Sequence, residues 1–342
     1  MIGVGGWGKN HLRVYSRLKQ LCTLKALCDI DENRARHYGE MYKIAWYTNV
    51  AALLEKEEID AVNICTPPLT HHPLALEAIR AGKHLLVEKP MAPTAPQAIE
   101  IYRAAKNKGL QLMVGFIERF NSGVLKVKSL IDSRDLGEVR YVSTSRIAPW
   151  TPEVDSLGVM MDTAIHDVDA VRFILGQDPV KVYAETSNQV EGYKGRETSA
   201  EILLRFQGDL SAYLVAEWLR PTGKVTRKIR HLQVTGSEGV AILSYIPQLV
   251  WKINAIDVLS PFVNEKGKPN YSRDPMEDNL IKPVVWKEPL EMELRSFLQS
   301  ITEGGEPAAS GKDGVRAVEI IESAARAVET GKPQTIIYRT LR

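Results

Sequence analysis

Asp162 and His166 are the two residues of this sequence best suited to proton transfer. They stand four positions apart in a stretch whose apolar spacing predicts a helix, so their side chains would share one helix face. A carboxylate beside an imidazole favours the charged ring and fixes its orientation, which suits a general base. A structural pair, made of a helix cap and a core residue, is the alternative that this spacing leaves open.

A metal site is a poorer interpretation of the same helix. Asp162, His166 and Asp169 supply few ligands, and the neighbouring His71 and His72 do not have the spacing of a metal site. We therefore predict that the chain binds no metal.

A glycine-rich stretch near the start of the chain has the spacing of a dinucleotide-binding loop. Gly3, Gly5 and Gly8 form a G-x-G-x-x-G pattern around Gly6 and Trp7, and a helical pattern begins directly after it. Glycines let the backbone approach a pyrophosphate, which lies at the N-terminus of the following helix. A tight turn without a ligand is the alternative.

Asp29 supports the dinucleotide interpretation. It follows 21 residues after Gly8 at the end of a predicted strand, where an acid hydrogen-bonds the adenine ribose and favours NAD over NADP. Arg34 is close enough in sequence to reach a 2′-phosphate, but Asp29 would repel that phosphate. We expect Arg34 to be a solvated helix residue and the cofactor to be NAD.

The strand in front of the glycine loop is short. Only Met1 and Ile2 precede Gly3, whereas strands usually have about five or six residues. Residues 1–4 can form an abbreviated strand, or the natural start lies upstream; we expect the second.

Two further polar stretches follow predicted strands, at the carboxyl edge of a parallel sheet where cofactors bind. A lysine at such a strand end could hydrogen-bond a substrate hydroxyl or share in proton transfer. A surface lysine is the alternative. The residues concerned are Thr66, Pro67, His71, Glu88 and Lys89.

Candidate substrate ligands lie in the second half of the chain. Arg119 and Asn121 begin it, and a basic stretch over 220–230 includes Arg227 and Lys228. Such a density of cations could hold a diphosphate or a carboxylate. A solvated loop explains the stretch equally well.

The elements that must position these residues fall into two groups. Residues 1–117 alternate between apolar strand patterns and helices, which implies parallel strands joined by right-handed crossovers. Asp31, Thr70 and Thr94 are expected to cap the helices that follow them. Residues 118–342 contain period-two segments that predict a large, mostly antiparallel open sheet, with helices at about 123–132, 289–302 and 313–330. We predict an α/β chain with an N-terminal doubly wound (Rossmann) NAD-binding domain and a C-terminal α+β domain for substrate binding and oligomerisation.

Composition excludes several classes of protein. The 342 residues carry a formal net charge of +2, with 44% hydrophobic and 25% charged residues, as in ordinary globular enzymes. This balance gives no reason to expect binding to nucleic acid or an anionic membrane. No apolar run approaches the roughly 20 residues of a membrane span, and we see no signal-peptide pattern. Three cysteines without a C-x-x-C pair fit a reduced, cytoplasmic protein.

In their order along the chain, these motifs resemble the glucose-fructose oxidoreductase / inositol dehydrogenase / rhizopine catabolism family (Gfo/Idh/MocA). The resemblance spans nearly the whole sequence. The stretches that carry it are GVGGWGKNH at 3–11, Thr66-Pro67 with His71, Glu88-Lys89-Pro90, and GVMMDTAIHDVDAVRFILG at 158–176.

The resemblance implies specific roles. Lys89, Asp162 and His166 would line the active site, and the Lys89-Pro90 bond would be cis as it often is in relatives. The glycine loop and Asp29 would bind NAD. One departure is that relatives commonly carry a run of glycines before D-x-x-x-H, whereas here Gly158 is followed by Val-Met-Met, which could alter substrate access.

Within the family, the stretches 115–121, 161–169 and 234–239 resemble nucleotide-sugar 3-dehydrogenases, which oxidise the 3-hydroxyl of a UDP-N-acetylhexosamine or its uronate. The expected partner is therefore a small sugar or nucleotide sugar. The open face of the predicted C-terminal sheet could pair with another subunit, and we expect a homodimer or homotetramer formed through it. Two alternatives remain: a polyol dehydrogenase of the inositol type, and a sensor that binds the dinucleotide without turnover.

Overall fold

The computed structural model describes residues 1–149, 157–188, 190, 195–219, 228–245, 248–254 and 287–341. Contacts divide the chain into two compact units. The first contains Met1–Phe120, Lys287–Glu322 and Ile337–Arg342, and the second contains Asn121–Trp286 and Ser323–Ile336. The sequence predicted a single boundary at 117/118, which would assign residues 287–322 to the second domain. The contacts place these residues in the first unit. An amphipathic pattern shows which helix face is buried, but not what covers it.

The first unit is built on parallel strands. β1 (Ala26–Cys28) pairs with β2 (Ala45–Tyr47), and β3 (Ala61–Ile64), β4 (His84–Glu88) and β5 (Leu112–Gly115) form a second ladder, all parallel. The predicted doubly wound parallel arrangement is confirmed.

Ile2 joins these two ladders. It makes parallel bridges to both Cys28 and Ile64. Its N–H donates to the carbonyl of Asn63 and its carbonyl accepts from the N–H of Cys65, each at 2.8 Å. The short segment before the glycine loop thus occupies the central position of the sheet, and it places the loop at the carboxyl edge.

The helices of the first unit begin at local capping signals. The side chain of Asp31 accepts from the N–H of Arg34 at 3.1 Å, and Asn49 accepts from Ala52 at 3.0 Å. Capping was also expected at Thr70 and Thr94, but neither side chain caps its helix; the Thr70 hydroxyl donates to the carbonyl of Pro67 instead. The helices are α1 (Gly8–Tyr15), α2 (Glu32–Tyr42), α3 (Val50–Lys56), η1 (Pro68–Thr70), α4 (His71–Arg80), α5 (Ala95–Asn107), η2 (Ile117–Phe120), α10 (Pro289–Thr302) and α11 (Gly311–Thr330), of which the residues up to Glu322 belong here.

The second unit contains an eight-stranded sheet in the order β12-β11-β10-β6-β9-β8-β7-β13. Neighbouring strands are antiparallel except β6 and β9, which are parallel. The prediction of a large, mostly antiparallel sheet is confirmed, although the last two strands were not expected. The strands are β6 (Val139–Pro149), β7 (Lys181–Ser187), β8 (Ser199–Arg205), β9 (Ser211–Leu219), β10 (Ile229–Gly236), β11 (Gly239–Tyr245), β12 (Gln248–Asn254) and β13 (Gln334–Thr335).

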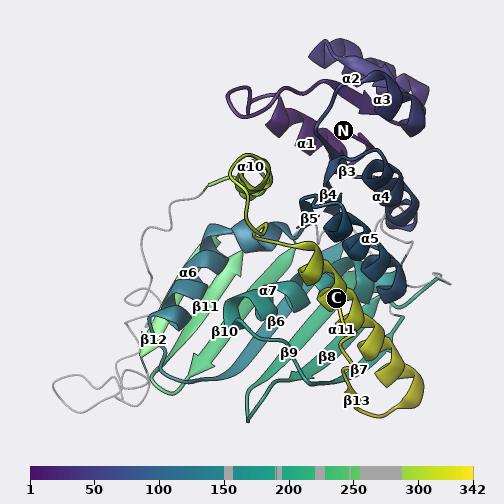
Figure 1. The fold of residues 1–342 in the computed structure, drawn as a ribbon. Coiled ribbons are helices and arrows are strands. Elements are labelled where there is room, and N and C mark those ends of the chain that lie inside the picture. The colour runs from purple at the N-terminus through teal and green to yellow at the C-terminus, as the bar shows by residue number, and fades with distance from the viewer. Residues whose placement is uncertain are drawn as a thin grey trace, which may run out of the picture. The chain divides into compact units, whose positions relative to one another are not determined.

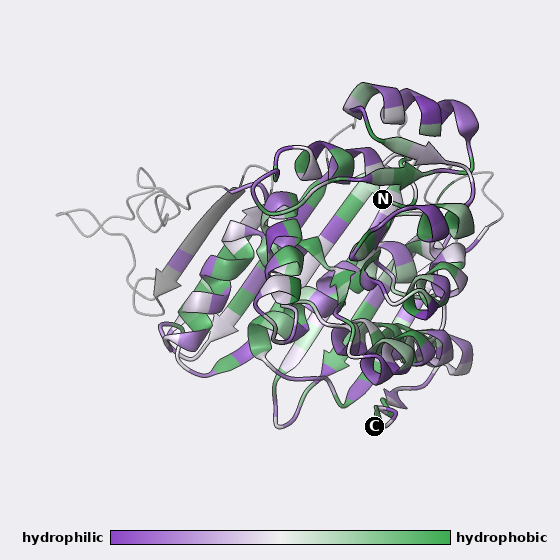
Figure 2. Ribbon diagram, turned by 45° about the horizontal axis from the view of Figure 1, so that its top comes forward, coloured by the Kyte–Doolittle hydropathy of each residue, from purple (hydrophilic) through white to green (hydrophobic). Residues whose placement is uncertain are grey.

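One face of this sheet is covered by helices. α6 (Ser122–Asp132) and α7 (Ile165–Leu175) lie on it together (Figure 1). Buried and half-buried residues alternate along the whole of β9, and hydrophobic and hydrophilic residues alternate along the strands of the sheet (Figure 2). Period-two burial is what a sheet with one covered face requires.

Across the described ranges, no helix combines the length and the apolar character that crossing a membrane would require.

Candidate active site

The glycine loop packs too closely to admit side chains at two of its positions. A Cβ on Gly3, whose φ is +81°, would lie 2.8 Å from the carbonyl oxygen of Cys65. A Cβ on Gly8 would lie 2.1 Å from the carbonyl oxygen of Gly3. These two glycines are therefore required by the turn itself.

The other side of the loop is open. A Cβ on Gly6 would meet no atom within 4 Å, and one on Gly5 would meet only a guanidinium nitrogen of Arg34 at 3.6 Å. The fold therefore does not demand glycine there, but a phosphate approaching the backbone would. The N-terminus of α1 follows directly, which is the usual place for a pyrophosphate. The loop fits a dinucleotide on these grounds.

Asp29 lies beside this loop with its carboxylate well hydrogen-bonded. Its side chain is 4% exposed. One oxygen accepts from the N–H of Val4 at 2.9 Å, and the other accepts from the N–H of Asp31 at 3.0 Å. The acid thus holds the glycine loop in place.

Arg34 is an exposed residue of α2, as expected from the sequence, and it also pairs with the acids beside the glycine loop. Its guanidinium lies 3.2 and 3.3 Å from the two oxygens of Asp29 and 3.2 Å from Asp31. The N-cap turn at Asp31 brings the start of α2 back towards the strand end, and a sequence pattern does not reveal that return.

His71 ties together the loops that follow β3 and β4. Its ring is fully buried, with Nδ1 2.8 Å from the carbonyl of Pro90 and Nε2 2.8 Å from the carbonyl of Thr66. Burial lowers the pKa of His71, and the hydrogen bonds to the carbonyls of Pro90 and Thr66 oppose that shift. His71 holds Thr66 and Pro67 beside the glycine loop, rather than reaching out of the fold. The peptide bond between Lys89 and Pro90 is cis, as the resemblance implied.

Glu88 is a second well hydrogen-bonded acid of the site. One oxygen accepts from Trp7 Nε1 at 2.9 Å and contacts His11 Nε2 at 3.1 Å, and the other accepts from the N–H of Lys89 at 3.2 Å. Burial raises the pKa of Glu88, but the interaction with His11, the charge of Lys89 and the hydrogen bond from Trp7 outweigh it, so that the pKa is lowered. Glu88 is therefore ionised beneath the half-buried Lys89.

His11 was quoted within the glycine motif but was not predicted as a site residue. It is fully buried. The available signal was its place one turn after Gly8 on α1, which turns it towards the sheet.

Arg119 and Asn121, predicted as substrate ligands, have structural contacts. The guanidinium of Arg119 is 7% exposed and lies 2.9 and 3.1 Å from the two oxygens of Asp313, while it also donates to the carbonyl of Ala308 at 2.8 Å. The side chain of Asn121 caps α6 by accepting from the N–H of Gly123 at 2.9 Å. We therefore leave both out of the proposed substrate site.

Asp162 and His166 lie in the second unit, but not on one regular α-helix. Asp162 is within a π-helical turn, Met160–Ala164, and His166 is in the first turn of α7. An oxygen of Asp162 accepts from the Thr163 hydroxyl at 3.1 Å, and that hydroxyl accepts from Trp218 Nε1 at 2.8 Å. Single π-helical turns occur often at functional sites. Both predicted catalytic side chains are half-buried.

Arg146 anchors α7 to β6 beside the candidate base. Its guanidinium contacts both oxygens of Asp167 at 2.8–3.1 Å, with both side chains at most 4% exposed. Further along the helix, Asp169 is buried and lies 3.5 Å from Arg172. The Arg146–Asp167 pair thus ties α7 to β6, whereas the Asp169–Arg172 pair lies within α7.

The sequence Gly158-Val-Met-Met has a structural reason. A Cβ on Gly158, at φ +80°, would lie 2.2 Å from the carboxylate of Glu197. That carboxylate accepts from the N–H of Met160 at 3.1 Å, and the side chains of 159–161 are buried in the core. The departure from the family pattern therefore fills the core and leaves Glu197 to hold the start of the π-helical turn.

Lys228 gives the second unit a positive region. Partial burial lowers its pKa, the charges of Arg230 and Arg146 lower it further, and Asp162 opposes them. Positive charge therefore gathers within electrostatic reach of Asp162. Arg227 lies outside the described residues.

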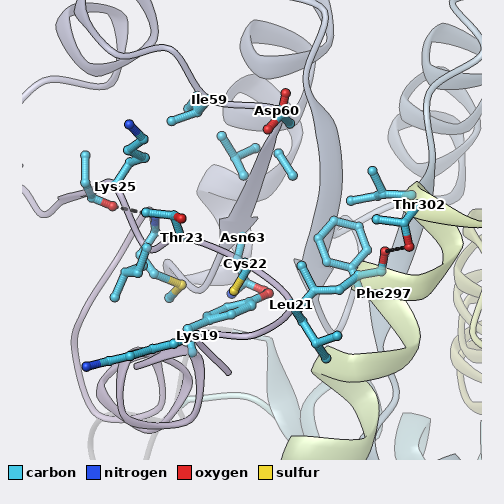
Figure 3. Close-up of a pocket in the computed structure, with 18 of the residues that line it drawn as sticks. Lys19, Leu21, Cys22, Thr23, Lys25, Ile59, Asp60, Asn63, Phe297 and Thr302 are labelled. Carbon is cyan, nitrogen blue, oxygen red and sulfur yellow. Dashed lines mark hydrogen bonds between the residues drawn. The ribbon is translucent and has the colours of Figure 1, made fainter. Parts of the chain in front are cut away.

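A cavity of about 640 Å³ in the first unit lies at a different edge of the sheet. It is lined by the amino ends of β1 and β3, and Figure 3 shows Phe297 and Thr302 of α10 on one side of it and Thr23 and Lys25 on the other. The glycine loop, Thr66 and Lys89 all follow the carboxyl ends of their strands. The cavity is therefore not the candidate site.

Two family models match the chain. One, for the Gfo/Idh/MocA oxidoreductase family and its NAD-binding Rossmann fold, matches residues 1–116. The other, for the family's C-terminal domain, matches residues 124–242. The two matches follow the order in which the candidate residues occur.

Curated relatives include dehydrogenases of both polyols and nucleotide sugars. Inositol 2-dehydrogenase of Rhizobium meliloti is 30% identical over 335 residues, covering 96% of each chain. UDP-N-acetylglucosamine 3-dehydrogenase of Acidithiobacillus ferrooxidans is 33% identical over 184 residues, covering 54% of this chain and 56% of its own. A solved structure of the latter superposes with a TM-score of 0.79 at 24% identity, covering 96% of each chain, which shows a shared fold.

Proposed function

We propose, since this chain belongs to the Gfo/Idh/MocA family of NAD-binding oxidoreductases, that it oxidises the 3-hydroxyl of a UDP-N-acetylhexosamine or its uronate. Its relatives are sugar and polyol dehydrogenases that act on a CH–OH group. The identity of the sugar and of the hydroxyl is the part that we propose.

NAD supplies the hydride acceptor when it is bound. The open side of the glycine loop, at Gly5 and Gly6, would hold its pyrophosphate, and Asp29 would accept hydrogen bonds from the adenine ribose. Thr66 and Pro67 stand at the next strand end, where His71 holds their loop in place.

Oxidation of the alcohol removes a proton and a hydride. In the proposal, His166 would accept the hydroxyl proton and bound NAD would supply the hydride acceptor, so that the alcohol becomes a carbonyl. Lys89 donates a hydrogen bond to the oxygen as negative charge develops there. Asp162 orients His166 or binds a neighbouring hydroxyl. Holding the reacting atoms at about 3–3.5 Å would supply much of the rate gain.

The observation that carries the choice of a nucleotide sugar is the positive region around Lys228. Its amine lies near Arg230 and Arg146, and Asp162 acts on it electrostatically. Lys228 is exposed, so its amine is available to an anionic ligand, and hydrogen bonds between an ammonium and a phosphate are among the strong ones. A diphosphate is such an anion, and an uncharged polyol has none.

The direct test measures NADH formation with purified protein, NAD and a panel of UDP-sugars and inositols. We expect turnover on a UDP-N-acetylhexosamine or its uronate, and a KM for it that rises about tenfold or more in Lys228→Ala. Lys181→Ala, at an exposed position of β7, is the control. A flat trace on every substrate, with NAD bound, would favour the sensor.

A polyol dehydrogenase is the second candidate, and the full-length similarity to inositol 2-dehydrogenase favours it. Such an enzyme needs no diphosphate contacts. Neutralising Arg227 and Lys228 together would then leave the KM for the polyol unchanged.

A further inference from the structure

His11 lies at the centre of a chain of hydrogen bonds beneath Lys89. Nδ1 of its buried ring is 3.1 Å from the amide nitrogen of Asn63, and Nε2 is 3.1 Å from Glu88. The chain starts at Tyr15, whose hydroxyl donates to the amide oxygen of Asn63 at 3.4 Å. These residues come from α1, β3 and β4, and all belong to the first unit.

Asn63 sets the tautomer of the ring. Its oxygen faces Tyr15, so its nitrogen faces both His11 and the sulfur of Cys65, the latter at 2.9 Å. An amide nitrogen only donates. Nδ1 of His11 must therefore accept, and the ring proton lies on Nε2, where it is donated to the Glu88 carboxylate.

Glu88, held by His11, in turn restrains the backbone of Lys89. Its second oxygen accepts from the backbone N–H of Lys89 at 3.2 Å. A Cβ on Gly115 would lie 2.7 Å from the Glu88 carboxylate, so the glycine on the neighbouring strand leaves the room that the carboxylate needs in this position. The imidazole, the carboxylate and the lysine backbone therefore have one mutually consistent arrangement.

We propose that His11 is a positioning residue for Lys89: the Nε2–H tautomer fixed by Asn63 holds the Glu88 carboxylate, and through it the backbone that carries the reacting amine. This inference rests on the proposed function, in which Lys89 contacts the substrate hydroxyl. Nothing in the chemistry of the glycine loop itself requires a histidine at this position.

A metal centre is the competing explanation for the same atoms. Donor atoms of His11, Cys65 and Glu88 lie within 4.8 Å of one another. Both nitrogens of the His11 ring already have hydrogen-bond partners, however, and a metal would displace one of them. The hydrogen-bonded arrangement leaves each of these groups satisfied.

The charged surroundings of Glu88 come from several elements. Four titratable groups interact electrostatically with Glu88. They are His11 of α1, Cys65 after β3, Lys89 at the end of β4 and Glu293 of α10. Among these groups, His11 contributes most to lowering the pKa of Glu88. Its loss should raise the pH at which Glu88 takes up a proton.

The test compares two substitutions of similar size. The amide nitrogen of glutamine can reach the place of imidazole Nε2, whereas that of asparagine matches Nδ1. His11→Gln should keep the contact with Glu88 and stay within about threefold of the wild-type kcat. His11→Asn should lose about 10- to 100-fold in kcat, keep the Kd for NAD within about threefold, and move the acid limb of the pH profile to higher pH.

His72 supplies a matched control. It also contacts a carboxylate through Nε2, that of Glu100 at 2.8 Å, but at an exposed site. His72→Asn should leave kcat and the pH profile unchanged. A wild-type kcat in His11→Asn, or equal losses in the Gln and Asn variants without a pH shift, would overturn the positioning role.

A measurement without turnover separates this inference from the proposed function. Nitrogen-15 NMR of the wild-type histidines should show His11 as the Nε2–H tautomer, and metal analysis should find no stoichiometric zinc. An Nδ1–H tautomer or one bound zinc per chain overturns the inference even if the enzyme is active. Absence of turnover with every sugar overturns the proposed function. In that case the tautomer of His11 measured by NMR still tests whether the hydrogen-bond chain exists.

Discussion

The guanidinium of Arg34 lies 3.2 and 3.3 Å from the two carboxylate oxygens of Asp29. The arginine is 42% exposed, and its Nη1 is 3.6 Å from where a Cβ on Gly5 would lie. The acid that favours NAD thus has its own counter-ion at the open side of the glycine loop. An isolated carboxylate repels the 2′-phosphate of NADP, whereas a carboxylate paired with a guanidinium repels that phosphate less.

Removing Arg34 should therefore sharpen the preference for NAD. In Arg34→Gln we expect the ratio of the Kd values for NADP and NAD to rise about tenfold, because a charge-assisted hydrogen bond to the 2′-phosphate is lost. Calorimetric titration with each dinucleotide measures the ratio. Arg36→Gln is the control, since Arg36 pairs with Glu32 on the same helix. An unchanged ratio in Arg34→Gln would remove Arg34 from cofactor selection.

Lys89 and His166 should affect turnover without affecting cofactor binding. Lys89→Ala and His166→Ala should each abolish measurable turnover of the best sugar substrate, because one loses the hydrogen bond to the developing alkoxide and the other loses the base. The Kd for NAD, titrated directly, should stay close to the wild-type value. The catalytic assignment fails for either residue whose alanine variant keeps the wild-type kcat.

Glu293 should make the protein less stable as the pH rises. Both oxygens of this fully buried carboxyl lack a hydrogen-bond partner among the described residues. Burial, and then the charges of Glu88 and Glu118, raise the pKa of Glu293 well above its ordinary value. When the pKa of a group is higher in the folded than in the unfolded state, the group stabilises the fold at pH values below its unfolded-state pKa. That stabilisation is lost as the pH rises towards the folded-state pKa.

Glu293→Gln should remove this dependence. The variant and the wild type should have similar free energies of unfolding near pH 4, since both side chains are then neutral. Above that pH the variant should become the more stable of the two by up to about 1.4 kcal/mol per pH unit, until the folded pKa is reached. Denaturant unfolding at a series of pH values measures the difference. Glu291→Gln, whose partner is Arg295 on the same helix, should show no such trend.

Breaking the buried pair of Arg146 and Asp167 should lower the free energy of unfolding more than replacing both residues with apolar ones. Asp167→Asn leaves the arginine charge buried without its carboxylate and should lower the free energy of unfolding by about 3–5 kcal/mol. The double variant Arg146→Met, Asp167→Leu should recover most of that loss, since neither charge then has to be desolvated. Chemical denaturation of the three proteins tests this. A single variant as stable as the wild type would show that the pair does not hold α7 to β6.

Several features of the site were predictable because they depend on local spacing. The predicted helix at 289–302 matches the bounds of α10, since apolar periodicity shows a helix directly. Asp31 was expected to cap a helix and does so. The regular helix expected through Asp162 was wrong, because a π-helical turn over Met160–Ala164 leaves the apolar pattern nearly unchanged.

The sequence by itself determined which chemical groups this protein has and in what order they follow its strands. The glycine spacing, the E-K-P motif and the D-x-x-x-H motif are each encoded within a few residues of the chain. Tertiary structure decided which groups meet. His11 and Glu88 are 77 positions apart, and Arg119 and Asp313 are 194 apart. Contacts at such separations depend on how helices pack on the sheet, and periodicity along the chain shows only which face is buried.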